Sequence, residues 1–307
     1  MTLARLRRYP VKSCRGEDLE SAQLERWGLA GDRRWMLVDT DGVKVTARET
    51  HVLLTVVPEL VPGGLRLSAP GAEPLLVTEP GIPDVEVDIW GNRVLASSAG
   101  EQAAEWFSAV AGRPVRLVFL DDPTRRPVDP ARSRHGDVVT FADAFPLLMA
   151  STSSLDRLND WIRDGGTTVA GVPPSEPLDI RRFRPNLVID GAEPFAEDTW
   201  SRIRIGDTEF RVAADCSRCV LTTVHPDTIE RGPEPIATLS RHRKAEGKVW
   251  FAVDLIPELG EAETERTGGT GGAGRTSVSL RVGDPVEVLE ANRHPTVPRA
   301  TALGARG

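Results

Sequence analysis

Short apolar runs separated by turn residues fill the first hundred residues, and they limit what this chain can fold into more than any other feature. The run RWMLVDTDGVKVTARE is interrupted at Asp41-Gly42, a strong signal for a β-hairpin. The stretches LRLSAP, PLLVTE and VEVDIWGNRVLASS repeat the alternation of short strands and turns. A barrel or sandwich-like domain is therefore predicted at the N-terminal end.

Helical spacing of apolar residues follows this β-rich region. The segment GEQAAEWFSAVAG places Ala103 and Phe107 on one face, with Gly112 as a plausible stop. The segment STSSLDRLNDWIRDGG carries Leu158 and Ile162 at helical spacing, and a short helix is expected in EPIATLSRHRK. Strands are expected in RPVRLVFL, PNLVID, WSRIRIGDTEFRVAAD, CVLTTV, KVWFAVDL and SVSLRVGDPVEVLE.

The predicted organisation is α+β and β-rich. Residues 1–120 form a β-rich domain, residues 121–292 form a second domain of mixed strands and short helices, and residues 293–307 form a frayed tail. The Pro- and Arg-rich stretch around residues 121–137 is expected to be a loop or a crossing between the domains. A glycine-rich segment at about 260–276 is expected to be a flexible loop.

Composition limits the classes of function. The chain has 307 residues, of which 40% are hydrophobic and 27% charged, as is typical of a soluble globular protein. Its formal net charge of −7 argues against nucleic acid or an anionic membrane as the main partner. No apolar run reaches the roughly 20 residues of a membrane span, and no signal peptide is evident. A cytoplasmic protein is therefore expected.

The segment DCSRC at residues 215–219 contains two of the three cysteines, spaced Cys-x-x-Cys. A thioredoxin-like motif would open a helix, whereas the β-branched residues that follow favour a strand. A structural zinc site needs about four ligands, and only Cys14 and scattered histidines remain. Arg218 between the two cysteines favours a thiolate. The spacing alone leaves a reactive thiolate and a turn with two buried cysteines as alternatives.

Several separated stretches resemble, in order, the MOSC-domain proteins. The closer resemblance is to the branch with an N-terminal MOSC β-barrel domain, which includes the mitochondrial amidoxime-reducing component and its bacterial relatives. FRPN followed some thirty residues later by CSRCVLTTV is the most specific part. The stretches are YPVKSCRG (9–16), GDRRWMLVD (31–39), VTARE (45–49), FRPNLVIDG (183–191), AEDTW (196–200), CSRCVLTTVHPDT (216–228) and VGDPVEVL (282–289).

The resemblance implies a MOSC-type β-barrel domain followed by a MOSC domain, and a molybdenum cofactor in its molybdopterin or nucleotide form. It implies that Cys219 is a direct ligand of molybdenum. A soft thiolate suits a thiophilic metal, and Arg218 beside it would stabilise the anion. The cofactor contacts that the family pattern implies are Lys12, Ser13, Arg33, Ser151, Thr152, Arg184, Asn186, Ser217 and Arg218.

The sequence also departs from the family pattern. His225 stands where an acidic residue is usual, and Ile229 stands where glycine is usual. Asp215 and His225 are candidates for proton transfer near the metal, because a carboxylate or an imidazole can act as a general acid. A turn-stabilising role is the alternative for Asp215.

The predicted function is a molybdenum-dependent oxidoreductase that removes the oxygen of N-hydroxylated or N-oxide compounds in a two-electron step at a cysteine-ligated molybdenum. The sequence has no iron–sulfur run of four cysteines and no dinucleotide glycine fingerprint. A separate electron-transfer protein, such as a ferredoxin, a flavodoxin, a cytochrome or a reductase, is therefore expected. The alternative is a sulfur-transfer or cofactor-carrier protein of the MOSC type without reductase activity.

Overall fold

The computed structural model describes residues 1–165, 176–259 and 278–297, and its largest element is a mixed sheet of nine strands. The order is β2-β1-β14-β13-β18-β16-β15-β20, and β17 pairs with β18. The sheet therefore gathers strands from distant parts of the chain. Its strands are β1 (Thr2–Arg8), β2 (Glu17–Leu19), β13 (Leu147–Ser151), β14 (Leu187–Asp190), β15 (Arg202–Ile205), β16 (Thr208–Ser217), β17 (Lys244–Ala245), β18 (Lys248–Glu258) and β20 (Val286–Glu290).

The first strand of the chain lies inside the sheet of the second half. β1 pairs antiparallel with β14, and Thr2 lies opposite Asp190. Leu6 of β1 is buried in the same apolar core as the neighbouring strands of this sheet. The boundary near residue 120 stays a prediction, but the two halves share one sheet through β1 and β2.

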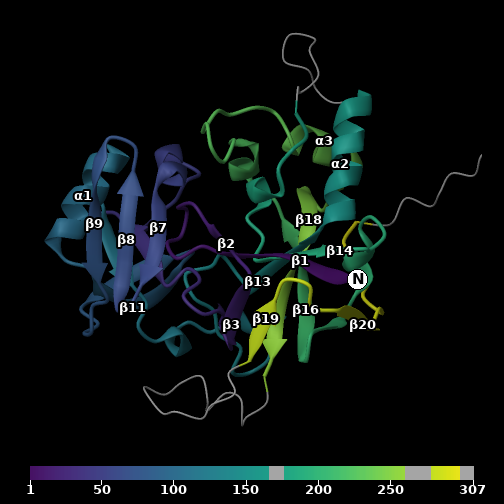
Figure 1. The fold of residues 1–307 in the computed structure, drawn as a ribbon, viewed down its shortest axis with the longest axis horizontal. Helices are drawn as coiled ribbons and strands as arrows, with labels where there is room; N and C mark the ends of the chain where they lie inside the picture. Colours follow the sequence, from purple (N-terminus) through teal and green to yellow (C-terminus); the bar gives the residue numbers. More distant parts are fainter. Residues whose placement is uncertain (166–175, 260–277, 298–307) are drawn as a thin grey trace, which may run out of the picture.

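Smaller sheets build most of the β-rich first half, and β7, β8, β9 and β11 lie at the left of Figure 1. One sheet has the order β10-β11-β12-β5-β6, another has the order β7-β8-β9, and a third joins β19, β3 and β4. The strands are β3 (Ser21–Glu25), β4 (Gly28–Leu29), β5 (Trp35–Val38), β6 (Lys44–Val45), β7 (Val57–Val61), β8 (Gly64–Ala69), β9 (Ala72–Thr78), β10 (Val85–Ile89), β11 (Asn92–Ser98), β12 (Arg116–Phe119) and β19 (Ser279–Arg281).

Two predictions for the first half are confirmed. Strands β5 and β6 form an antiparallel hairpin whose turn contains Gly42 at a φ of 79°. Helix α1 (Glu101–Ala111) ends at Gly112, whose φ of 68° is the left-handed conformation that stops a helix. Ala103 and Phe107 face the core, as their spacing predicts.

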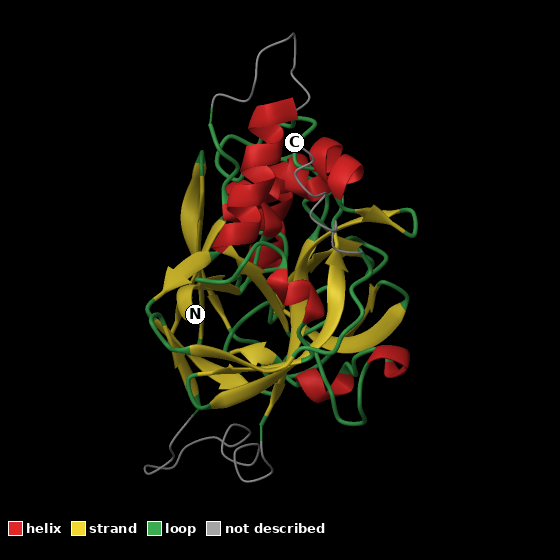
Figure 2. Cartoon of the chain, turned by 90° about the vertical axis from the view of Figure 1, so that its right-hand side faces the viewer, coloured by secondary structure: helices red, strands yellow, loops and turns green. Residues whose placement is uncertain are grey.

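Helices α2 (Thr152–Gly165) and α3 (Ile236–His242) pack against the large sheet, as Figures 1 and 2 show. Leu158 and Ile162 of α2 join Leu239 of α3 and Phe251 of β18 in one core. The helical spacing predicted for the first segment and the short helix predicted for the second are therefore confirmed. This layer holds β13, β14 and β18 in place, and β13 and β18 contribute Leu148, Trp250 and Asp254 to the candidate site described below.

The prediction of a strand over CVLTTV is wrong. Val220–Thr223 form a 3₁₀ helix with Cys219 at its N-cap. Local hydrogen bonds outweigh the β preference of these residues, because the Thr222 hydroxyl donates to the Cys219 carbonyl (3.0 Å) and the Thr223 hydroxyl donates to the Val220 carbonyl (2.7 Å). The remaining 3₁₀ helices are His51–Thr55, Pro123–Arg125, Pro130–Arg132, Ile180–Phe183 and Ala196–Thr199.

The α+β, β-rich fold class predicted from the sequence is confirmed. The tail prediction holds less well at its start, because Arg293 donates a backbone hydrogen bond to Thr199 and Val297 is buried. Residues 298–307 and the glycine-rich segment at 260–276 lie outside the described residues. Within the described part of the chain, no helix is long and apolar enough to cross a membrane.

Candidate functional site

A cavity of about 830 Å³ lies where the two halves of the chain meet. Lys12, Arg33 and Trp90 line it from the first half, and the end of β16 and part of β18 line it from the second half. A volume of this size suits a cofactor together with a small substrate. The junction between the two halves is therefore the candidate functional site.

The cavity is positively charged although the whole chain is acidic. Eight lysine and arginine residues line it, against four carboxylate residues. A formal net charge of −7 for the chain means that the cations are concentrated here. The lining therefore favours an anionic ligand. The cations are Lys12, Arg33, Arg48, Arg132, Arg182, Arg184, Arg218 and Lys248, and the carboxylates are Asp143, Asp215, Glu246 and Asp254.

Lys12 lies at the floor of the cavity and is almost fully buried. Its ammonium group donates to the Phe141 carbonyl (2.7 Å) and to the Asp143 carboxylate. Burial lowers the pKa of Lys12 to about 8, and the negative charge of Asp143 opposes that change. Lys12 is therefore mainly charged at neutral pH and is fixed in one position.

Asp143 was not predicted from the sequence, yet it connects three cavity residues. Besides Lys12, it accepts hydrogen bonds from Arg48 Nη2 (2.7 Å) and from Trp90 Nε1 (3.3 Å). Burial opposes ionisation, but Lys12 and Arg48 outweigh it and hold the pKa of Asp143 well below its usual range. Asp143 is therefore an anion that orients two cations rather than a proton donor.

Arg33 and Asn186 form a fixed pair across the domain junction. Arg33 Nη1 donates to Asn186 Oδ1 (2.9 Å) and to Asp32 Oδ2 (2.5 Å). Asn186 Nδ2 in turn donates to the Arg7 carbonyl (3.1 Å). Both predicted residues line the cavity, and their hydrogen bonds tie the two halves together.

Arg184 lines the cavity with a buried hydrogen-bond donor that has no partner. Its guanidinium group lies 4.2 Å from the centre of the Tyr9 ring, and Arg33 lies 4.5 Å from the same ring. Among the described residues, the buried Nη2 atom of Arg184 makes no hydrogen bond. A buried donor without a partner is costly, so this atom is suited to an incoming anion.

Backbone strain is concentrated around the cavity. Ser13, Arg33, Arg184 and Glu246 have φ values of 70°, 47°, 57° and 51°, a conformation that residues other than glycine seldom adopt. All four line the cavity. Strain of this kind persists where the surrounding structure fixes it, and it is common at functional sites.

Cys219 receives a hydrogen bond from a residue of the other half of the chain. Arg48 Nε lies 3.2 Å from Cys219 Sγ, and the same guanidinium group binds Asp143. Arg48 therefore directs a charged hydrogen-bond donor at the Cys219 sulfur. Arg48 was not predicted as a site residue, although it lies in the VTARE stretch that carries the family resemblance.

Arg218 does not stabilise the Cys219 thiolate, which corrects the prediction from the sequence. Its Nη1 atom donates to Cys216 Sγ (2.9 Å), and its Nη2 atom donates to the Phe183 carbonyl (2.7 Å). The turn after β16 directs the side chains of Arg218 and Cys219 differently, so Arg218 binds Cys216 and not its neighbour Cys219. Arg218 and Ser217 nevertheless both line the cavity.

Cys216 and Asp254 form a second group that the sequence did not predict. Asp254 of β18 lines the cavity and is hydrogen-bonded to the Cys216 side chain. Burial raises the pKa of Asp254 to about 7, although Arg218 and Arg132 oppose the rise. Burial also raises the pKa of the Cys216 thiol to about 12. Asp254 is therefore a group that can hold and release a proton near neutral pH.

The two residues predicted for proton transfer have other roles in the structure. Asp215 accepts hydrogen bonds from Arg293 Nη2 (2.7 Å) and the Thr296 backbone (2.8 Å). Burial raises its pKa, but these bonds outweigh burial and lower the pKa below the usual value. His225 lies outside the cavity lining, and its Nδ1 atom accepts from the backbone of Asp227 and Thr228. Both contacts are structural.

Ser151 and Thr152 also lie outside the cavity lining, which differs from the predicted cofactor contacts. The Ser151 side chain is fully buried and hydrogen-bonded to Ser154 (2.7 Å). Thr152 donates to the Asp190 carboxylate. The Glu197 carboxylate accepts a hydrogen bond from Ser154 (2.7 Å), so these hydroxyls hold a buried acid beside helix α2.

Few side chains near Cys219 could bind a metal ion together with it. Within residues 1–165, 176–259 and 278–297, no group of three or more His, Cys, Asp or Glu side chains has a metal-binding arrangement. The residues that the structure describes therefore offer a metal at Cys219 one sulfur ligand and no cluster of further ligands. This donor set, one soft thiolate surrounded by cations, fits a metal that arrives within an anionic cofactor.

Comparison with known proteins identifies the class that this fold and cavity define. Residues 1–114 match the MOSC N-terminal beta barrel domain, and residues 136–287 match the MOSC domain. The chain therefore belongs to the MOSC-domain proteins that carry an N-terminal MOSC β-barrel domain. The resemblance predicted from the separated sequence stretches is confirmed.

The relatives include mitochondrial amidoxime-reducing component 1 of Mus musculus, which is 32% identical over 301 residues, 94% of this chain and 82% of that protein. The Homo sapiens protein of the same name is 31% identical over 301 residues, 94% of this chain and 83% of that protein. The molybdenum cofactor sulfurase of Oryza sativa subsp. japonica is 31% identical over 277 residues. That match spans 85% of this chain and a third of the sulfurase, 33%.

Proposed function

We propose that the cavity binds the molybdenum cofactor, with Cys219 Sγ as the ligand from the protein. The residues fit this group, because a thiolate is a suitable ligand for molybdenum and the Arg184 Nη2 donor is buried without a partner. The names of the relatives support the assignment, since they include amidoxime-reducing components and a molybdenum cofactor sulfurase.

The proposed activity is the reduction of N-hydroxylated compounds. The overall reaction takes two electrons and two protons and converts an N–OH group into N–H and water. The bound cofactor supplies the two electrons that cleave the N–O bond. This substrate class is supported by the amidoxime-reducing relatives and by a cavity of about 830 Å³.

Arg48 holds the thiolate of Cys219 in this proposal. Its Nε atom donates to Sγ at 3.2 Å, and Asp143 fixes the same guanidinium group from the other side at 2.7 Å. A fixed hydrogen bond holds a metal-ligating atom in one orientation and tunes its electron density, as hydrogen bonds around the ligands do at other metal sites. Arg48 is therefore a positioning residue for the metal ligand.

Asp254 supplies a proton in this proposal. Its carboxyl group faces the cavity, and burial raises its pKa to about 7, close to the pH of most cells. The charged groups around it are Arg218, Arg132 and Asp143, and the Cys216 thiol is its hydrogen-bond partner. Asp215 does not serve this purpose, because its carboxylate is bound by Arg293.

The electrons come from a separate protein. The sequence has three cysteines and no dinucleotide glycine fingerprint, so the chain does not carry an iron–sulfur cluster of four cysteines or a Rossmann site for a nicotinamide cofactor. The class of this partner, whether a ferredoxin, a flavodoxin, a cytochrome or a reductase, is open to direct measurement with each in turn.

The observation that carries the proposal is the Arg48–Cys219 contact inside a cationic cavity. Its test is the metal and pterin content of anaerobically purified protein, measured by elemental mass spectrometry and pterin fluorescence. We expect about one molybdenum and one pterin per chain, and reduction of an amidoxime with an artificial electron donor. Protein that carries neither, from a host whose other molybdoproteins are loaded, would refute the assignment.

The match to molybdenum cofactor sulfurases favours a second candidate function, a cofactor carrier or sulfur-transfer module. The half-buried Cys216 thiol is poorly suited to carry sulfur, because desolvation raises its pKa to about 12. Transfer of bound cofactor to an apo-molybdoenzyme, without reduction of any N-hydroxylated compound, would establish the carrier instead of the reductase.

A further inference from the structure

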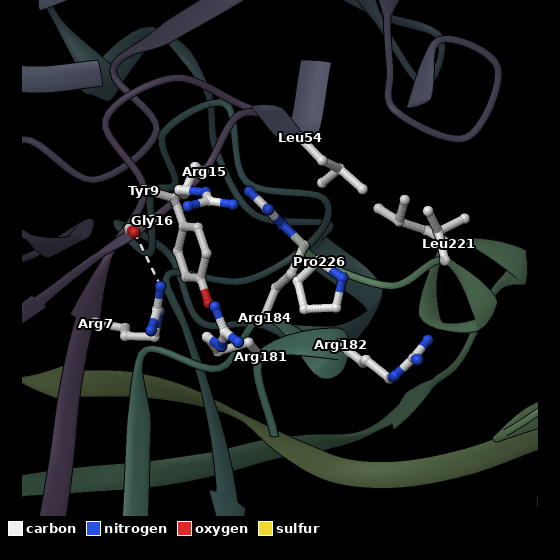
Figure 3. Close-up of a pocket in the computed structure, with 11 residues that line it drawn as sticks. Arg7, Tyr9, Arg15, Gly16, Leu54, Arg181, Arg182, Arg184, Leu221 and Pro226 are labelled. Carbon is white, nitrogen blue, oxygen red and sulfur yellow. Dashed lines mark hydrogen bonds between the residues drawn. The ribbon is translucent and has the colours of Figure 1, made fainter. Parts of the chain in front are cut away.

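A second, smaller pocket lies beside the cavity, and its charged lining is entirely cationic. Its volume is about 30 Å³, and no carboxylate residue lines it within the described part of the chain. Figure 3 shows arginine side chains gathered around the Tyr9 ring and apolar side chains on the opposite side. We call it the arginine pocket. Its arginines are Arg7, Arg15, Arg181, Arg182 and Arg184.

Carboxylates outside the pocket neutralise only some of these arginines. Asp18 binds Arg7 at 2.8 Å, and Asp227 binds both Arg15 (2.8 Å) and Arg181 (2.6 Å). The two arginines that also line the large cavity, Arg182 and Arg184, have no carboxylate partner among the described residues. The pocket thus keeps an excess of positive charge.

Three buried donor atoms of the arginine pocket have no hydrogen-bond partner among the described residues: Arg7 Nε, Arg15 Nε and Arg184 Nη2. Arg7 is 5% exposed, so water does not readily satisfy its Nε atom. Burial also lowers the pKa of Arg184 to about 10, as expected for a cation without a counter-ion. Buried cations and unpaired donors together are the features that an anion would satisfy.

The walls of the arginine pocket are held in place before any ligand arrives. Tyr9 is almost fully buried, and its hydroxyl donates to the Pro185 carbonyl at 3.2 Å. Gly16 accepts a hydrogen bond from Arg7 Nη2 at 2.9 Å. A Cβ atom on Gly16 would lie 2.5 Å from the Tyr9 ring, so only glycine permits this packing.

We propose that the arginine pocket is a binding site for a phosphate-type oxyanion. Its volume of about 30 Å³ is two to three times the roughly 10–15 Å³ that a single water needs. That space is of the size that a small anion requires. Guanidinium groups bind such oxygens with paired N–H donors, and the anion supplies the missing counter-charge of Arg182 and Arg184.

The oxyanion can come from two sources, and the second source depends on the arginines that the two spaces share. A free inorganic phosphate or sulfate ion would occupy the pocket independently of the proposed cofactor. Alternatively, the phosphate end of a molecule in the large cavity would reach the pocket, because Arg182 and Arg184 line both spaces. The first source does not depend on the proposed function, and the second does.

The test is a calorimetric titration of cofactor-free protein with inorganic phosphate, at constant ionic strength against chloride. Arg15 and Lys12 form a matched pair of variants, because Arg15 lines only the arginine pocket and Lys12 lines only the large cavity. We expect Arg15→Gln to weaken phosphate binding about tenfold, the loss of one charged hydrogen bond. We expect Lys12→Gln to leave it unchanged.

Arg181→Gln is a second variant at a residue that lines only the arginine pocket, and it should also weaken binding, which keeps the test valid if Arg15→Gln folds poorly by circular dichroism. Phosphate that binds no more tightly than chloride would overturn the proposal. So would a loss of phosphate binding in Lys12→Gln that neither pocket variant shows. Repeating the titration with cofactor-loaded protein identifies the source: blocked binding indicates the cofactor's own phosphate, and retained binding indicates a free anion. If the protein does not load molybdenum, the titration of cofactor-free protein still tests the arginine pocket.

Discussion

Cys216 and Cys219 are three residues apart, yet each contacts a different part of the wall of the same cavity. Cys219 receives a hydrogen bond from Arg48, which belongs to the first half of the chain and is itself fixed by Asp143. Cys216 contacts Arg218 and Asp254, both from the second half. One wall therefore presents a sulfur bound to a fixed cation, and the other presents a sulfur next to a carboxyl group that titrates near neutral pH.

The difference teaches that tertiary partners, and not sequence neighbours, decide the chemistry of each thiol. Arg218 is adjacent to Cys219 in the sequence, but its side chain binds Cys216. The cation that reaches Cys219 comes from 171 residues earlier in the chain. The Cys219 wall is suited to hold a metal, and the Cys216 wall is suited to deliver a proton.

The largest expected effect distinguishes the two sulfurs directly. Replacing Cys219 by Ala should abolish both molybdenum retention and reductase activity, because the only proposed protein ligand is lost. Replacing Cys216 by Ala should keep the metal and most of the activity. Metal content by elemental mass spectrometry, measured beside activity, checks this. Equal losses in both variants would break the comparison and indicate that the thiols act as a pair.

Removing the proton source is expected to have the next largest effect. The Asp254→Asn variant should keep its molybdenum but lose about 10²-fold in kcat, a typical contribution of a general acid. The wild-type kcat should fall as the pH rises through about 7, where Asp254 loses its proton. That limb of the pH profile should disappear in the variant. The matched control is Asp215→Asn, whose profile should keep the limb.

Weakening the cation of the Cys219 wall should cost less. The Arg48→Gln variant removes the charged hydrogen bond to Sγ and should lower metal retention and kcat/KM about tenfold. Arg48→Lys keeps the charge and should restore part of the loss. Arg218→Gln, on the Cys216 wall, should leave metal retention near wild type. If it causes the larger loss of metal, the assignment of one cation to each sulfur is wrong.

The buried acid also predicts a dependence of stability on pH. The folded protein holds a proton on Asp254 up to about pH 7, whereas an ordinary aspartate releases it near 3.8. The folded state therefore binds more protons in this interval, and its free energy of unfolding falls as the pH rises. Asp254→Asn should be more stable than wild type at pH 8 by about 2 kcal/mol. Urea unfolding at pH 5 and pH 8 checks the difference, which should be smaller at pH 5 than at pH 8 because the folded protein keeps its Asp254 proton at pH 5.

His225 provides the smallest expected effect. Its Nδ1 atom only accepts backbone hydrogen bonds within its own turn, so His225→Ala should change kcat less than about twofold and stability by about 0.5 kcal/mol. Initial rates and a melting curve are sufficient. A large loss of kcat with normal metal content would indicate that His225 takes part in the reaction and that its turn moves toward the cavity.

The sequence was a good guide where a local pattern carries the information. The hairpin at Gly42 and the ends of α1 follow from turn residues and helical spacing. The family resemblance located Lys12, Arg33, Arg184 and Cys219, and all of these line the cavity.

Residues that act through distant contacts could not be predicted. Asp143 and Asp254 lie in segments without a recognisable motif. Asp143 gains Lys12 and Arg48 only where the two halves meet, and Asp254 gains Arg218 and Arg132 only through the fold of the second half. Ser151 and Thr152 fit the family stretch, but their hydroxyls satisfy Glu197, Ser154 and Asp190 instead. The 3₁₀ turn after Cys219 was missed because threonine hydroxyls bond to nearby carbonyls, which outweighs their preference for strands.

The pairing of β1 with β14 sets an order of events during synthesis. Thr2 lies opposite Asp190, so the first strand leaves the ribosome well before its partner exists. At the usual elongation speed of 5–20 residues per second, this delay is about 10–40 s. β16 and β18, which complete the cavity, are made later still. β2 can pair with one edge of β1 early, but the nascent chain must keep the other edge of β1 from wrong partners until the second half appears, and no cofactor can be enclosed before that time.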